Sequence, residues 1–131
     1  MNESPSKKLV LGGRIISGLI GLLMLASAGA KLSSQPVVLE AFTKQFGYPV
    51  GTVTPIGVIE ATCVILYAIP QTSVLGAILI TGYLGGAVAT HVRVGEPWFA
   101  PFVLGVLAWL GLFLRDARIR SLIPLVNNQN R

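Results

Sequence analysis

Four long apolar runs, separated by short polar or proline-containing segments, dominate the pattern of the chain. They are Leu9–Leu32, Val53–Ile69, Ser73–Val94 and Phe99–Leu114. At a helical rise of 1.5 Å per residue, the first three approach or exceed the ~30 Å hydrocarbon core of a bilayer; the fourth reaches roughly 24 Å unless Trp98 and Arg115 extend it. In lipid, every backbone N–H and C=O group must be hydrogen-bonded within the protein, which leaves helices or closed barrels. The runs lack the alternation of apolar and polar residues that is typical of barrel strands. The pattern therefore predicts an all-α protein, an integral membrane four-helix bundle, with residues 1–131 as a single domain.

Composition agrees with this class. Of 131 residues, 53% are hydrophobic and 11% charged, and the mean hydropathy is +0.73, which is too apolar for a soluble domain of this size. The net charge of +5 comes from basic residues at the ends of the runs, and not from a basic face of the kind that binds nucleic acid, so we expect no nucleic-acid partner.

The positions of the basic residues predict a topology. Seven of the ten flank the start of the first run or the end of the fourth: Lys7, Lys8, Arg14, Arg115, Arg118, Arg120 and Arg131. The positive-inside rule then places both termini in the cytoplasm, as expected for a multi-pass protein of a bacterial-type plasma (inner) membrane.

The first run has an alternative interpretation. Basic residues followed by Ile15–Leu25 and an Ala-x-Ala pattern at Ala26–Ala30 are also typical of a signal peptide. We favour a retained helix because the apolar stretch is longer than a usual signal core, and its removal would leave three helices with an unbalanced topology.

The outer connection, residues 33–52, is the only sizeable segment between the runs. Pro36 is suited to the first turn of a short helix, which we expect to lie on the outer membrane surface or to fold over the bundle. Such a helix would carry Val37, Val38, Ala41, Phe42 and Phe46 on one side and Glu40, Lys44 and Gln45 on the other.

Small residues recur along two runs at helical spacing and predict close helix packing. Their stripe on the third run could meet the first run or, alternatively, a second copy in a homo-oligomer. The packing residues are Gly13, Ser17 and Gly21 on the first run and Ala77, Thr81, Gly82, Gly85, Gly86 and Ala89 on the third.

Glu60 is the main candidate for a functional residue. It lies within an apolar run, where a carboxylate costs about 2.5 to 3.5 kcal/mol and persists only with a partner or a wet cavity. With the predicted topology, Lys31, His91 and Arg93 fall in the same outer half, which predicts a polar pocket in which Glu60 pairs with Lys31 or His91. Snorkelling to headgroups is the alternative for Lys31 and Arg93, and a plain interfacial hydrogen bond is the alternative for His91.

Other chemistry has little support in the sequence. A single histidine and scattered carboxylates predict no metal site. The lone Cys63 excludes an intrachain disulfide. No complete set of catalytic residues is recognisable, so a non-catalytic membrane subunit is favoured over a free-standing enzyme.

Several segments in order resemble the DoxX-like membrane proteins. They are Tyr48-Pro49, Ile56-Gly57 with Glu60, the long run from Leu75 to Gly95 containing Thr-Gly-Tyr-Leu-Gly-Gly-Ala and Ala-Thr-His-Val-Arg, and Trp109 to Arg118. The likeness spans Gly29 to Pro124. It implies a four-helix bundle and places Lys31, Glu60, His91 and Arg93 on the polar motif of the family.

The resemblance also implies a functional class. The family takes its name from the membrane subunit of a thiosulfate:quinone oxidoreductase, so we expect a redox-associated or quinone-interacting accessory subunit, with a quinone as candidate cofactor and membrane lipids and a redox protein as partners. No thiosulfate-handling motif is present. The alternatives are a small proton-linked transporter or channel-like bundle that uses Glu60 and His91, and an assembly factor without a ligand.

Overall fold

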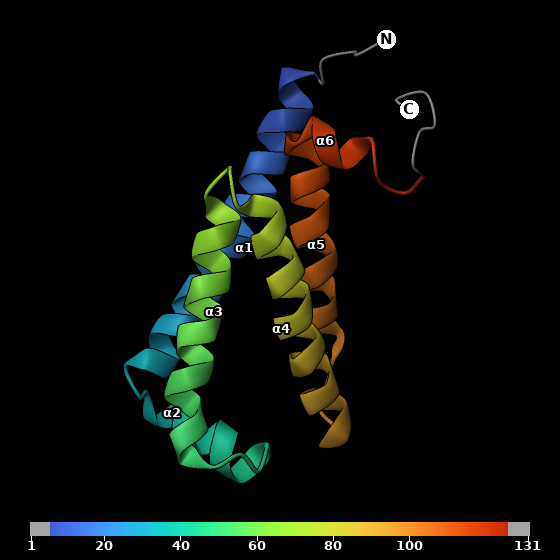
Figure 1. Cartoon of the computed structure of the whole chain (residues 1–131). Coiled ribbons are helices and arrows are strands. Elements are labelled where there is room, and N and C mark those ends of the chain that lie inside the picture. Colours follow the sequence, from blue (N-terminus) through green and yellow to red (C-terminus); the bar gives the residue numbers. More distant parts are fainter. Residues whose placement is uncertain (1–5, 126–131) are drawn as a thin grey trace.

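The computed structural model describes residues 6–125, and all of its regular elements are helices (Figure 1). The four long apolar helices are α1 (Lys7–Leu32), α3 (Val53–Ala68), α4 (Ser73–Arg93) and α5 (Phe99–Arg115). Within the described residues there are also four shorter elements: α2 (Pro36–Glu40), a π-helical turn (Ala41–Gln45), a 3-10 turn (Val50–Thr52) and α6 (Ala117–Arg120). The helix boundaries expected from the hydrophobic pattern agree with these to within two residues.

Local chemistry explains several helix ends. The Ser6 hydroxyl accepts a hydrogen bond from the amide of Leu9 and so caps the start of α1. Pro36 occupies the first turn of α2, where its missing N–H costs nothing. Between α4 and α5, Gly95 has a φ of 74°, a left-handed conformation that glycine adopts without strain.

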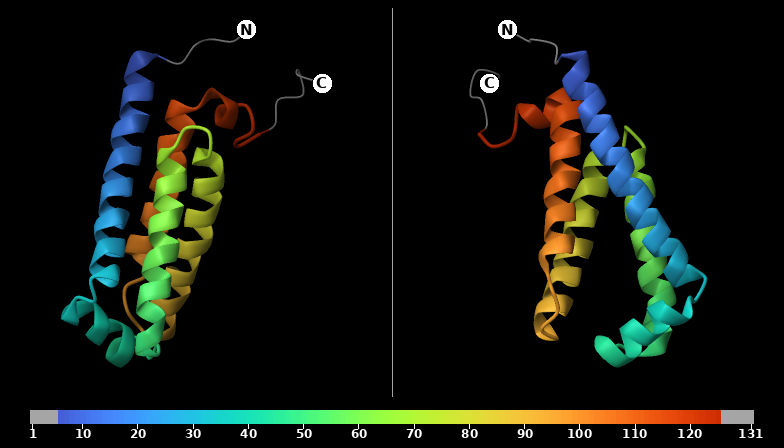
Figure 2. Two further views of the ribbon diagram at one scale, coloured as in Figure 1. Left: turned by 60° about the vertical axis from the view of Figure 1, so that its left-hand side comes forward. Right: turned by 180° about the vertical axis from the view of Figure 1, so that it is seen from behind.

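The four long helices form a ring. Helix α1 contacts α3 and α5, and α4 contacts the same two helices, so α1 and α4 lie diagonally opposite. Figures 1 and 2 show α1 and α3 diverging from α4 and α5 toward the end that carries residues 33–52. At the opposite end, the start of α1, the turn between α3 and α4, and α6 lie close together.

Tyr67 of α3 ties three helices at the closed end of the ring. Its side chain is 1% exposed; its hydroxyl donates to the carbonyl of Ala108 on α5 at 2.6 Å and lies 2.9 Å from Ser17 Oγ on α1. A buried tyrosine needs such a partner for its hydroxyl. The surrounding core is apolar, with Ile80 and Leu112 almost wholly buried.

Close helix contacts are made by glycines, but only partly by the expected ones. A Cβ on Gly13 would lie 2.7 Å from the carbonyl oxygen of Gly111, which brings α1 against α5. A Cβ on Gly76 would lie 2.2 Å from the backbone nitrogen of Tyr67, which brings α4 against α3. Gly21 faces Val64 of α3 at 3.9 Å. The small residues of α1 therefore face α3 and α5, and not α4.

Along most of its length, the small-residue stripe of α4 does not pack closely against another helix, contrary to the expectation. Ala77 is fully buried, and Thr81 accepts a hydrogen bond from Trp109 Nε1 of α5 at 2.7 Å. A Cβ added to Gly82, Gly85 or Gly86 would meet no neighbouring atom within 4 Å, and Ala89 is exposed. No helix within residues 6–125 therefore packs closely on these four residues. Gly82 and Gly86 face the space where α4 diverges from α1 and α3, whereas Gly85 and Ala89 lie exposed outside it.

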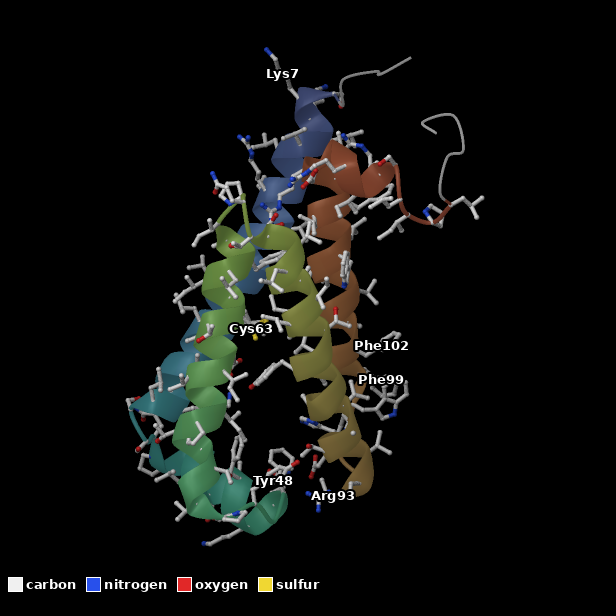
Figure 3. All side chains as sticks on the ribbon, in the orientation of Figure 1. Lys7, Tyr48, Cys63, Arg93, Phe99 and Phe102 are labelled. Atoms are coloured by element: carbon white, nitrogen blue, oxygen red, sulfur yellow. The ribbon has the colours of Figure 1, made fainter. Side chains whose placement is uncertain are left out.

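The outside of the bundle is apolar. Leu22 of α1 is 68% exposed, Ile59 of α3 55% and Val106 of α5 53%. Phe99 and Phe102 likewise point away from the bundle (Figure 3). In the described part of the chain, three helices are long and apolar enough to cross a membrane, and α5 is a shorter apolar helix. Such surfaces are stable against lipid and not against water, and the chain is a multi-pass membrane protein.

Candidate functional site

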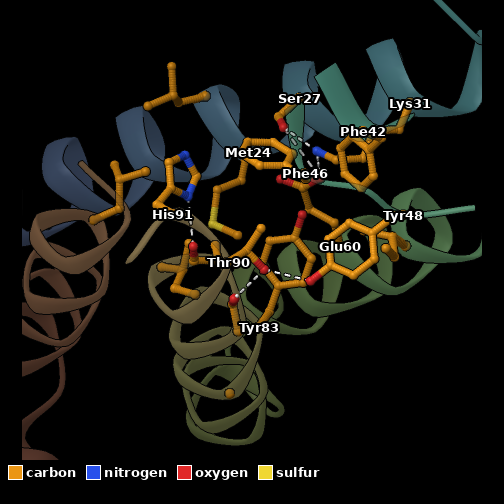
Figure 4. Close-up of a pocket in the computed structure, with 17 residues that line it drawn as sticks. Met24, Ser27, Lys31, Phe42, Phe46, Tyr48, Glu60, Tyr83, Thr90 and His91 are labelled. Carbon is orange, nitrogen blue, oxygen red and sulfur yellow. Dashed lines mark hydrogen bonds and ion pairs between the residues drawn. The ribbon is translucent and has the colours of Figure 1, made fainter. Parts of the chain in front are cut away.

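A cavity of about 610 Å³ lies between the diverging helices. All four long helices and the outer connection line it, and most of the lining is apolar or aromatic (Figure 4). Gly82 and Gly86 form part of its α4 wall, so the absence of side chains there widens the cavity. The glycines expected to pack helices thus contribute open space to the site.

A buried ion pair lies at one end of this cavity. Lys31 Nζ is 2.7 Å from Glu60 Oε2, and the two residues are 7% and 2% exposed. The same ammonium donates to Ser27 Oγ at 2.7 Å, and Ser27 Oγ donates to Glu60 Oε2 at 3.3 Å. Ser27 precedes Lys31 by one helical turn, so both face α3. The expected pairing of Glu60 with Lys31 is therefore present, with Ser27 as an additional member.

Aromatic side chains of the outer connection close the cavity over this pair. Phe42 and Phe46 lie edge to face with centroids 5.9 Å apart, and Lys31 Nζ is 5.9 Å from the Phe42 ring. The Tyr48 hydroxyl and Thr90 Oγ1 of α4 are 2.7 Å apart. The connection thus folds over the bundle with its aromatic side facing inward. This is one of the two arrangements expected from the sequence; the other was a helix lying on the membrane surface.

Tyr83 of α4 completes the polar end of the cavity. It lines the wall opposite the ion pair, and its hydroxyl points toward Glu60 (Figure 4). Sequence reasoning did not single out Tyr83 or Ser27. The signal for Ser27 was available in its spacing from Lys31, whereas the position of Tyr83 depends on how α4 is rotated toward α3.

His91 and Arg93 do not pair with Glu60. His91 lines the cavity, but its Nδ1 bonds with the carbonyl of Ala87 on its own helix at 2.7 Å, and its ring lies 5.2 Å from that of Phe46. Arg93 is outside the cavity lining. Its guanidinium donates to the carbonyl of Phe46 and lies 5.4 Å from the centre of the Tyr48 ring, near the end of α4 (Figure 3). Arg93 therefore holds the outer connection against α4.

The remaining candidate chemistry is modest. Within residues 6–125, no group of three His, Cys, Asp or Glu side chains is arranged to hold a metal ion. Cys63 is buried one turn from Glu60 and points into the bundle (Figure 3). Its surroundings are those of a small core residue.

The fold and site define a helical membrane protein with an apolar, aromatic-lined pocket around one buried ion pair. The sequence matches the DoxX-like family over residues 15–112, and the chain belongs to this family. The match begins earlier and ends earlier than the resemblance seen from motifs; it covers α3 and α4 entirely and most of α1 and α5. No curated protein and no solved structure matches the chain significantly.

Proposed function

We propose that this DoxX-like protein binds a lipid-soluble quinone in the large cavity and serves as a non-catalytic accessory subunit of a membrane redox system. The observation that carries the proposal is the combination of an aromatic-lined cavity with a buried ammonium at one end. A cavity of about 610 Å³ lies within the usual range for small-molecule pockets, which are mostly apolar with a few convergent polar groups.

The polar end offers hydrogen-bond donors to a carbonyl oxygen. Lys31 uses two of its three N–H groups on Ser27 and Glu60, which leaves one for a ligand. Tyr83 supplies a hydroxyl on the facing wall. Glu60 pairs with the ammonium at this depth, where an isolated charge would be too costly. Phe42, Phe46 and Tyr48 provide faces and edges against which a planar ring can pack.

The packing favours a ligand pocket over a proton-linked passage. A passage needs polar groups along the whole length of the bundle, whereas Tyr67, Ile80 and Leu112 are almost wholly buried in an apolar core beyond the cavity. The helices are also continuous, without the interruptions typical of transporters.

The test is quinone retention by purified protein. The full chain is extracted from bacterial membranes in mild detergent, and bound quinone is measured by mass spectrometry per mole of protein. The diagnostic variant is the double substitution Lys31→Met/Glu60→Gln, which removes both buried charges while preserving side-chain size. Its matched control is Lys44→Gln/Glu40→Gln, which removes the exposed ion pair of the outer connection.

We expect wild type and the control to retain quinone and the diagnostic variant to lose about tenfold in retention, as expected when a hydrogen bond from a charged donor worth about 1.5 kcal/mol is lost. Equal retention by a folded diagnostic variant, or no quinone enrichment over the detergent extract in wild type, would overturn the proposal.

A further inference from the structure

A second cavity, of about 230 Å³, lies at the opposite end of the bundle. Three parts of the chain that are far apart in the sequence meet there: α1 with Arg14, the α3–α4 turn with Pro70 and Ser73, and the end of α5 together with α6, which carry Arg115 and Arg118. Figure 1 shows α6 lying across this end, directly after α5. The cavity is therefore created by the tertiary fold.

The charges around this cavity are unbalanced. Three guanidinium groups and one carboxylate line it. The carboxylate, Asp116, lies 2.7 Å from Arg118 Nη2 and also accepts the backbone N–H of Arg118. Arg118 lowers the pKa of Asp116 through these bonds, so the carboxyl stays ionised and engaged with Arg118. Within residues 6–125, Arg14 and Arg115 form no ion pair.

Arg115 is held in place but uses few of its hydrogen-bond donors. Its Nη2 donates to the carbonyl of Tyr67 at 3.2 Å, and its guanidinium carbon lies 5.0 Å from the centre of the Tyr67 ring. Its Nε is buried and has no hydrogen-bond partner in the described part of the chain. Within residues 6–125 the other terminal nitrogen, Nη1, makes no hydrogen bond, so its N–H groups are available to a ligand in the cavity.

We propose that this second cavity binds a phosphate oxyanion, with Arg14 and Arg115 as its charged donors. Guanidinium groups match phosphate in geometry as well as charge. The apolar helix α5 ends at Arg115, so the cavity lies where the bilayer surface begins. Basic pockets between membrane helices at that depth are suited to anionic lipid headgroups. A lipid phosphodiester and a free phosphate present the same oxygens, and the test separates the two sources.

The experiment is native mass spectrometry of the full chain in detergent with equal amounts of phosphatidylglycerol and phosphatidylcholine, in the presence and absence of inorganic phosphate. Arg14→Gln is the diagnostic variant, because Arg14 is exposed and its replacement should not disturb folding. Lys8→Gln is the control: it removes the same charge from an exposed position on the same helix outside the cavity.

For wild type and Lys8→Gln we expect preferential retention of phosphatidylglycerol, and for Arg14→Gln a reduction of about fivefold, the factor for about 1 kcal/mol per basic residue at an anionic surface. Retention that survives millimolar inorganic phosphate identifies the headgroup as the ligand. Displacement of the lipid by inorganic phosphate, but not by chloride at equal ionic strength, identifies a free-phosphate site. The proposal is overturned if neither form of phosphate binds better than its control, or if Lys8→Gln and Arg14→Gln lose retention equally.

Discussion

At the scale of single residues, the Lys31–Glu60 pair is the costliest feature of the bundle. Both charges are removed from water at membrane depth, and their attraction and the hydrogen bonds with Ser27 offset part of that cost. A pair of well-packed neutral residues would be at least as stable. Stability alone therefore does not explain why two charges lie beside a cavity, which agrees with the proposed ligand site.

The pair makes a specific prediction about stability. Glu60→Gln alone leaves Lys31 buried without a counterion, so we expect a loss of about 3 kcal/mol in the free energy of unfolding. The double variant Lys31→Met/Glu60→Gln removes both charges and should recover most of that loss. Thermal unfolding in one detergent measures both; a double variant no more stable than Glu60→Gln would contradict this account of the pair.

At the scale of helices, close approach depends on a few glycines at crossing points. Gly76 lies in the first turns of α4, where the backbone of Tyr67 occupies the space that a Cβ would need. Gly85, two and a half turns later, has open space around it. The same residue type thus has opposite roles at the packed and the diverging ends of α4.

This contrast predicts different effects for the same substitution. Gly76→Ala places a methyl group 2.2 Å from a backbone nitrogen, so α3 and α4 must separate, and we expect a loss of about 3 kcal/mol or protein that fails to fold. Gly85→Ala should be neutral or stabilising by up to about 1 kcal/mol. Yields of folded protein and unfolding temperatures of the two variants give the comparison; equal behaviour would show that the α3–α4 crossing is looser than described.

The helices themselves could be predicted from the sequence, because hydrophobic length and flanking charge determine where a chain crosses a membrane. Their rotation and neighbours could not. The stripe from Gly82 to Ala89 has the spacing of a packing face, yet α4 diverges from α1 there, and a cavity results. Likewise the cost of burying Glu60 predicted a partner, but the choice of Lys31 over His91 depends on a hydrogen bond between His91 and its own helix.

At the scale of the whole molecule, the two ends have different chemistry. The outer connection covers a large apolar cavity with an internally neutralised ion pair, whereas the other end carries a small cavity with excess positive charge. An apolar core separates the two. We expect the two ends to lie at the two faces of the membrane, with the arginine-lined end at the cytoplasmic face. Basic residues and anionic lipid are both typical of that face.

Reporter fusions test this orientation directly. Lys7 and α6 lie at the same end of the bundle, the end rich in basic residues, so fusions of a cytoplasm-active reporter after Arg131 and before Met1 should both be active.

A reporter active only in the periplasm, inserted in the exposed part of the outer connection between Gln35 and Pro36, should be active as well. The insertion position has few contacts with the bundle, so folding should survive. Inactivity of both terminal reporters together with inactivity of the inserted one would mean that the termini lie outside and that residues 33–52 stay inside. The large cavity would then open toward the cytoplasm, and the arginine-lined cavity would face away from the leaflet in which its proposed ligand is expected.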